Sequence, residues 1–369
     1  MFKNLARVRL SRRIAMIWLA AGMAFATTAP RAQTAPEPLK IGFVYVTPIG
    51  DAGWTFQHEQ GRLAMQRALG ARVATTVVEG VAEGADAERV MRDLATSGHR
   101  LIFATSFGYL EPALRVAADY PAVRFEHAGG YKTAPNLATY DARYYEARYL
   151  AGLLAGATSR SGIAGYVAGF PVPEVVQGIN AFALGMLEAN PKAQVRVLWL
   201  NSWFDPARER EAALTLVNQG ADVLTNHTAS PAVAQAAQDL KVRVIANQSD
   251  MRRYAPDAQL AAVTHHWGGH YTRVAQSVLE GRWTAQAMWG GMKAGLVALS
   301  AIDPSVPAPV RELIDVRRQE IKAGRFKPFS APLIDNAGAV RLAAGALDDR
   351  AIGAMNWFVR GVAGSVPRP

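Results

Sequence analysis

Residues 39–61 read LKIGFVYVTPIGDAGWTFQHEQG, and this stretch decides the fold class. Ile41–Val46 is an apolar run of β-branched and aromatic residues, as in a buried strand. A glycine-rich turn follows, and from Phe56 to Leu69 apolar residues recur three and four positions apart, as in an amphipathic helix. A buried strand that turns into a helix is the repeating unit of a parallel α/β sheet.

The same alternation continues outward in two series, separated by a long helix at 145–157 and a polar break at 159–162. Continuous apolar strands indicate parallel sheets that are covered by helices on both faces. We therefore predict an α/β fold with two doubly wound parallel-sheet lobes joined by crossover strands. Further strands are predicted at 74–78, 101–104, 123–125, 163–167, 195–200, 221–224, 242–246 and 260–263, with helices at 86–97, 111–119, 174–189, 206–219 and 230–240.

The domain boundaries follow from this pattern. The proline-rich C-terminal segment indicates hairpins and connections, with a last helix near 351–362. We expect a signal peptide at 1–26, a flexible leader at 27–38, a first lobe at 39–158 with a crossover helix at about 267–281, a second lobe at 159–265 with part of 282–345, and a C-terminal helix and tail at 346–369.

The N-terminus has the features of an export signal. Five basic residues and no acid precede the apolar run Ile14–Phe25, and Ala24 and Ala26 have the spacing of a signal peptidase site. The chain contains no cysteine, so neither a disulfide nor a lipid anchor attached to cysteine is expected. We expect a protein that is cleaved after export and stays free in the periplasm.

The net charge of +10 comes largely from the N-terminus. Residues 1–32 hold six basic residues and no acid, and their removal leaves 34 basic and 30 acidic residues. A nucleic-acid-binding surface needs a strong basic excess, so we expect no nucleic-acid partner.

Candidate ligand-binding residues stand where strands end. Ligands of parallel sheets bind outside the carboxyl ends of the strands, and two facing lobes can close on a ligand by hinge bending. Asp51 and Trp54 follow the first strand, and Trp203 and Phe204 follow the strand at 195–200. Each tryptophan stands at a strand-to-helix turn, one in each predicted lobe. If the two lobes face each other, the two rings could hold a flat ring between them by stacking. The alternative is that both tryptophans pack in the core.

Other polar strand ends allow two interpretations. Glu126 and His127 could hydrogen-bond the edge of a base, or they could be ordinary strand-end residues. His265, His266 and His270 include a pair four residues apart that could face one metal on a helix, but no acidic or cysteine ligand is adjacent, so no metal is expected. No phosphate-binding loop, zinc-protease motif or nucleophile elbow is present, and Asp51 lacks the neighbouring aspartates of a calcium-dependent nucleoside hydrolase. We therefore expect neither an enzyme nor a cofactor.

Four segments carry a family resemblance, namely IGFVYVTPIGDAGWTFQHEQG at 41–61, LNSWFDPARE at 200–209, GRFKPFSAPLIDNAG at 324–338 and MNWFVRGVAG at 355–364. They resemble the basic membrane protein family of ABC-importer solute-binding proteins, several of which bind purine nucleosides. The resemblance implies a periplasmic binding protein fold of type I and a purine clamped between aromatic residues. Trp54 and Trp203 match these aromatic positions, and Thr55 stands where nucleoside binders often have an asparagine that contacts the base.

Two departures from the family pattern bear on the ligand. Gln248-Ser249-Asp250 replaces an Asp-x-Asp, and Trp267 stands where relatives have a lysine. In the relatives, the first aspartate and the lysine hold ribose hydroxyls, which need partners in a closed cleft. The replacement of both charges favours a free base such as adenine over its nucleoside.

The predicted function is therefore capture of a purine by a periplasmic, monomeric component of an ABC importer that delivers it to a membrane permease. One alternative is a ligand-sensing protein that binds another flat heterocycle. The other is a nucleoside-hydrolysing enzyme.

Overall fold

The computed structural model describes residues 37–367. The predicted signal peptide at 1–26 and nearly all of the predicted leader at 27–38 lie outside the described residues. The described residues 37–367 form one compact unit. Within the described part of the chain, no helix combines the length and the apolar character needed to cross a membrane.

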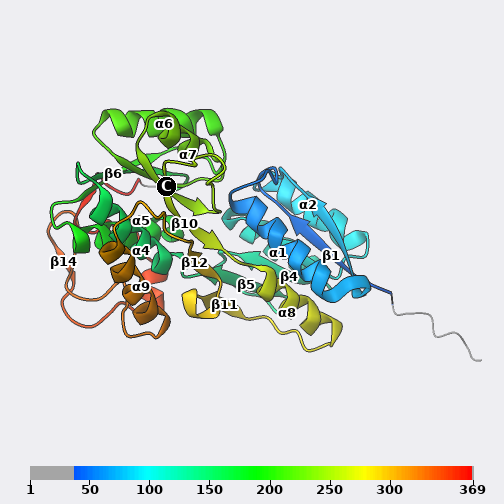
Figure 1. Ribbon diagram of the computed structural model, residues 1–369. Helices are drawn as coiled ribbons and strands as arrows, with labels where there is room; N and C mark the ends of the chain where they lie inside the picture. The colour runs from blue at the N-terminus through cyan, green and yellow to red at the C-terminus, as the bar shows by residue number, and fades with distance from the viewer. Residues whose placement is uncertain (1–36, 368–369) are drawn as a thin grey trace, which may run out of the picture. The chain divides into compact units, whose positions relative to one another are not determined.

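The first sheet contains the strand that opens residues 39–61 (Figure 1). Its order is β11-β5-β4-β3-β1-β2, and every pair is parallel. The inner strands β1 and β3 are almost entirely buried, as their continuous apolar sequences predict. The strands are β1 (Leu39–Val44), β2 (Val73–Val78), β3 (Leu101–Ala104), β4 (Arg124–Ala128), β5 (Leu137–Ala142) and β11 (Ala287–Gly290).

The second sheet has the order β12-β10-β9-β8-β6-β7-β15. All of its pairs are parallel except the edge pair of β12 and β10. We call each sheet with its covering helices a lobe. The strands are β6 (Ile163–Ala168), β7 (Gln194–Trp199), β8 (Val223–His227), β9 (Arg243–Gln248), β10 (Gln259–His265), β12 (Val297–Leu299) and β15 (Val362–Ala363).

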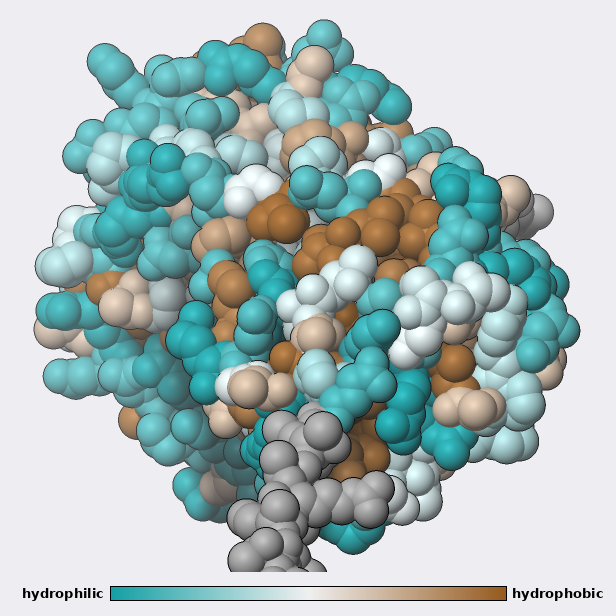
Figure 2. Space-filling view, turned by 90° about the vertical axis from the view of Figure 1, so that its right-hand side faces the viewer, coloured by the Kyte–Doolittle hydropathy of each residue, from teal (hydrophilic) through white to brown (hydrophobic). Residues whose placement is uncertain are grey.

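Helices follow the strands along both sheets and bury their apolar stripes against them. Among the helices of the first lobe, α8 is separated from α1 by some 200 residues of chain and yet packs against it. The face shown in Figure 2 is largely hydrophilic, with hydrophobic residues visible between the polar ones. The helices are α1 (Trp54–Leu69), α2 (Ala85–Thr96), α3 (Leu110–Asp119), α4 (Tyr144–Thr158), α5 (Pro173–Ala189), α6 (Pro206–Asn218), α7 (Ala232–Asp239) and α8 (Gly268–Leu279).

The chain passes between the two sheets after β5, after β10 and after β11. These crossovers join two doubly wound lobes, so the predicted fold class is confirmed. They also bring the carboxyl ends of strands from both lobes to one region, which positions the site.

The C-terminal third differs from the sequence prediction in one helix. The proline-rich segment predicted as hairpins and connections contains a 15-residue helix, α9 (Ala308–Lys322). Its prolines stand before the helix or in its first turn, where a backbone N–H has no partner within the helix. The prolines therefore begin this helix.

The prediction of a last helix near 351–362 is also wrong. Only the five-residue α10 (Asp349–Gly353) is helical, and Val362 pairs instead with Val195 of β7. The apolar residues of this segment complete the edge of the second sheet. Strand β5 was missed as well, because its six residues run almost directly into α4.

Candidate functional site

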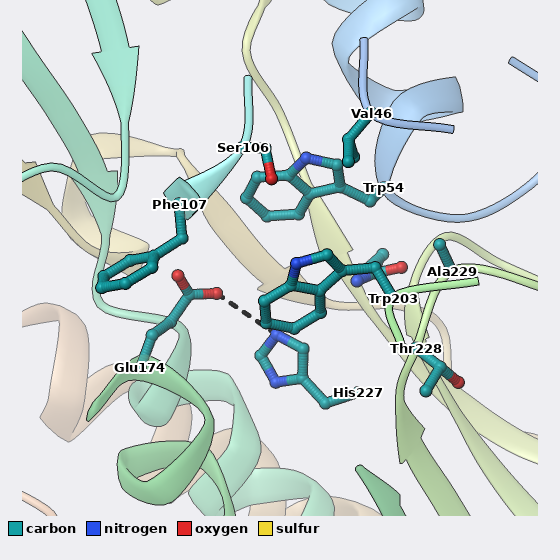
Figure 3. Close-up of a pocket in the computed structure, with 10 residues that line it drawn as sticks. Val46, Trp54, Ser106, Phe107, Glu174, Trp203, His227, Thr228 and Ala229 are labelled. Atoms are coloured by element: carbon teal, nitrogen blue, oxygen red, sulfur yellow. Dashed lines mark ion pairs between the residues drawn. The ribbon is translucent and has the colours of Figure 1, made fainter. Parts of the chain in front are cut away.

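One cavity is lined by residues of both lobes and lies beyond the carboxyl ends of the strands (Figure 3). The space between its lining atoms, including space open to solvent, is about 400 Å³. Aromatic residues line it together with a few polar groups. The lining residues are Val46, Trp54, Ser106, Phe107, Glu174, Trp203, His227, Thr228, Ala229 and Gln248.

Trp54 is the first residue of α1 and comes from the first lobe. Gly53 precedes it with φ at 93°, a conformation that favours glycine, and so turns the chain sharply from β1 into the helix. The indole Nε1 donates a hydrogen bond to the Thr105 carbonyl at 2.7 Å. This bond holds the ring in place within its own lobe.

Trp203 follows β7 and comes from the second lobe. Its indole lies below that of Trp54 in Figure 3, and its Nε1 donates across the lobes to Glu83 Oε1 at 3.3 Å. Glu83 also accepts a hydrogen bond from Ser106 Oγ at 2.6 Å. Gly169 allows the ring to approach, because a Cβ at that position would lie 2.7 Å from an indole carbon. Both indole N–H groups are therefore used by the protein, which leaves the ring faces for a ligand.

An acidic side chain lies at one end of the cavity. Glu174, at the second position of α5, places Oε1 3.2 Å from Nε2 of His227, the last residue of β8. Burial lowers the pKa of His227 well below its ordinary value, so the imidazole is neutral. Burial raises the pKa of Glu174 to about 7, while the buried guanidinium of Arg148 opposes this rise.

Gln248 ends β9 in a strained conformation. Its φ is 68°, in the left-handed region that side chains other than glycine rarely adopt. Its buried Oε1 has no hydrogen-bond partner among residues 37–367. Strain of this kind costs of the order of 1–3 kcal/mol and gathers at functional sites. The strained backbone and the unpaired oxygen make Gln248 a candidate for a ligand contact.

The two lobes touch at the rim of the cavity. Ser249 of the second lobe accepts hydrogen bonds from Gly53 N at 2.8 Å and from Gln57 Nε2 at 2.9 Å. Asp51 pairs with Arg253 at 2.6 Å and accepts a hydrogen bond from Tyr254. These contacts hold the lobes together over the cavity.

Three of the predicted ligand-binding residues, Trp54, Trp203 and Gln248, line the cavity together. The other residues near the two turns do not line it. Asp51 forms the rim ion pair, and Phe204 is 39% exposed and borders a separate hollow. Thr55 is buried and shares a 2.6 Å hydrogen bond with Thr47, which fixes the turn before α1.

The remaining predicted residues also lie outside the lining. Glu126 accepts a hydrogen bond from Trp283 Nε1 at 2.7 Å. Trp267 is 1% exposed and stacks on His58, with ring centroids 5.2 Å apart.

The last two predicted residues, His127 and Asp250, do not line the cavity either. His127 is fully buried, and burial lowers its pKa to about 3. Asp250 is exposed and accepts from Gln259 Nε2 at 2.7 Å.

Glu174 and His227 were missed by the sequence analysis. His227 ends the strand that was predicted at 221–224, so the strand-end rule would have found it had the strand been extended by three residues. Glu174 is the second residue of α5, which follows β6 after a four-residue connection, and no local signal distinguishes it from a solvent-facing acid. Within residues 37–367, no group of three or more histidine, aspartate or glutamate residues could hold a metal ion.

Comparison with known proteins assigns the family. The profile of the Bmp family, described as PnrA-like ABC transporter substrate-binding proteins, matches residues 39–325. The chain belongs to this family. This Bmp-family chain is 48% identical to a purine-binding protein of Brucella abortus (strain 2308) over 335 residues, which cover 90% of this chain and 95% of the relative.

Two further matches are to ABC transporter proteins of other organisms. A Haloferax volcanii protein, provisionally named as an ABC transporter glucose-binding protein, is 37% identical over 90% of this chain and 82% of its own length. A solved solute-binding protein of an ABC transporter system from Aeropyrum pernix K1 aligns with a TM-score of 0.67 over 80% of this chain and 94% of its own, at 20% identity. The predicted family and the prediction that the chain is no enzyme are confirmed, because the family consists of substrate-binding proteins.

Proposed function

We propose that this Bmp-family protein captures a purine between Trp54 and Trp203 and prefers a free base such as adenine to the nucleoside. The observation that carries the proposal is a single cavity lined by one indole from each lobe, with both indole N–H groups already bonded to protein. Stacking of a base on an aromatic side chain contributes about 1–3 kcal/mol. The 48% identity to a purine-binding relative supports the same ligand class.

The preference for a base rests on the shortage of partners for ribose. Trp267, which replaces the lysine of nucleoside binders, is buried against His58 and is absent from the cavity lining. Gln248 offers an uncharged amide where those relatives have a carboxylate. A sugar enclosed without partners for its hydroxyl groups would lose hydrogen bonds to water.

We further propose that the protein acts in the periplasm as a monomer and delivers its ligand to an ABC-importer permease. The family assignment supports a role in ABC transport. A second candidate ligand is a hexose, since the Haloferax volcanii relative is named for glucose. The aromatic lining of the cavity favours a flat ring over a hexose.

Titration calorimetry on the exported, ligand-stripped protein tests the proposal. We expect adenine or a related base to bind, adenosine to bind at least tenfold more weakly, and glucose to give no heat of binding. Mass spectrometry of the ligand that co-purifies with the protein gives an independent readout. Tight binding of glucose with no response to purines would contradict the proposed ligand class.

A further inference from the structure

The carboxylate of Glu174 is a polar group at the cavity whose purpose the fold does not explain. It lies between Phe107 and the Trp203 indole in Figure 3, and its side chain is 15% exposed. Gly129 faces its second oxygen, because a Cβ at that position would lie 3.5 Å from Oε2. An acid in a cavity with mainly aromatic walls is costly unless it has a partner.

His227 occupies only one of the two carboxylate oxygens. His227 Nε2 lies 3.2 Å from Glu174 Oε1, and burial keeps this imidazole neutral. His227 Nδ1 has no hydrogen-bond partner among residues 37–367. The arrangement orients the carboxylate, and within the same described residues Oε2 accepts no hydrogen bond.

Charged groups around Glu174 set its ionisation. Arg148 of α4 is fully buried, and its charge favours the carboxylate. Asp141 of β5 is partly buried, and loss of solvent together with the charge of Glu174 raises its pKa. Above about pH 8, Glu174 is therefore an anion that accepts hydrogen bonds.

We propose that Glu174 is the specificity-determining residue of the cavity and accepts a hydrogen bond from the imidazole-ring N–H of a free purine base. This inference rests on the proposed function and deepens it. A free base carries an acidic N–H on its five-membered ring, which suits a carboxylate acceptor. A nucleoside has its sugar on that nitrogen, so it has no ring N–H to donate and leaves Oε2 unpaired.

The test measures binding of two ligands that differ at this one N–H. Titration calorimetry at about pH 8 compares adenine with 9-methyladenine, whose neutral five-membered ring has no N–H. The variant is Glu174→Gln, and the matched control is Glu146→Gln, a partly buried acid of α4 that does not line the cavity. Thermal unfolding without ligand checks that both variants fold.

In the unaltered protein and in Glu146→Gln, adenine should bind about 10- to 150-fold more tightly than 9-methyladenine, the value of a hydrogen bond to a charged group. In Glu174→Gln, adenine should weaken by a similar factor, and the preference should shrink to within about threefold. Equal binding of both ligands by the unaltered protein would overturn the role of Glu174, as would a preference that survives in Glu174→Gln. Failure of the unaltered protein to bind any purine would instead overturn the proposed function.

Discussion

At the residue scale, the two indoles are held differently. Trp54 donates its N–H within its own lobe, whereas Trp203 donates to Glu83 of the other lobe. The first ring is therefore in place before the lobes meet. The second is held by Gly169 and Phe170 of its own lobe and by the bond to Glu83 of the other.

Removal of either indole should weaken purine binding. Trp54→Ala and Trp203→Ala each delete one stacking face, so each should cost about 1–3 kcal/mol, or roughly five- to 150-fold in affinity. The double variant should be non-additive, because a ring that has lost one face is no longer held against the other. Titration calorimetry with adenine measures all three variants.

Phe204→Ala is the matched control, since Phe204 adjoins Trp203 but does not line the cavity. It should bind like the unaltered protein. If the two tryptophan variants also bind like the unaltered protein, the stacking assignment is wrong.

A buried histidine should make the stability depend on pH. Burial lowers the pKa of His127 to about 3, whereas in the unfolded chain it titrates near 6.5. The unfolded state alone takes up this proton as the pH falls below 6.5, so the free energy of unfolding decreases there. This contribution is fully present above pH 6.5 and is lost progressively toward pH 3.

As the pH is lowered from 6 to 4, the free energy of unfolding should fall less steeply in His127→Gln than in the unaltered protein. The two slopes should differ by up to about 1.4 kcal/mol per pH unit. Urea unfolding at several pH values measures this slope, which is independent of any constant loss of stability in the variant. Parallel curves for the two proteins would show that the histidine titrates normally in the folded state.

At the element scale, the close packing of α4 on α5 depends on glycine. A Cβ at Gly152 would lie 1.9 Å from the Phe182 carbonyl oxygen, and one at Gly185 would lie 2.1 Å from that of Tyr149. Both contacts involve backbone atoms, so no side-chain movement can relieve them. Helices α4 and α5 are thereby held in backbone contact, and α5 is the helix that carries Glu174.

Gly152→Ala should therefore destabilise the fold, although alanine favours a helix by about 1 kcal/mol over glycine. Overpacking of this kind costs typically about 1–3 kcal/mol and sometimes more, and here the helices must separate. Gly353→Ala in α10 is the control, because no atom lies within 4 Å of its Cβ position. Urea unfolding that shows equal stability for both variants would mean that the helices have room to move.

At the scale of the whole molecule, contact between the lobes requires Gly53. A Cβ at this position would lie 2.0 Å from the Ala229 carbonyl oxygen of the other lobe. The same residue bonds to Ser249 and precedes Trp54. Closure and the placement of the first indole thus depend on one position.

Gly53→Ala should keep the lobes apart and abolish purine binding. We expect ligand to reduce the radius of gyration of the unaltered protein in small-angle scattering, as hinge closure requires, and to leave the variant unchanged. Gly50→Ala is the control, because Gly50 also has a positive φ but its nearest contact is 4.0 Å away. Compaction of the Gly53→Ala variant by ligand would contradict this role.

The sequence determined what depends on neighbours along the chain. The apolar run at 41–46, the glycine turn and the helix after it are local patterns, so the strand–helix order and the position of Trp54 at a strand end followed directly. Trp203 followed by the same reasoning in the second lobe. The resemblance of four segments to one family added the class of protein, which the match over 39–325 confirms.

The tertiary structure decided what depends on residues far apart in sequence. Trp267 and His127 have the residue types and positions of ligand contacts, yet packing of α8 buries one and the first lobe buries the other. Glu174 resembles any exposed acid in sequence, and only the approach of α5 to β8 pairs it with His227 in an aromatic cavity. Burial and electrostatic environment arise from contacts between distant segments, whereas hydrophobic periodicity reports only on contacts a few residues away.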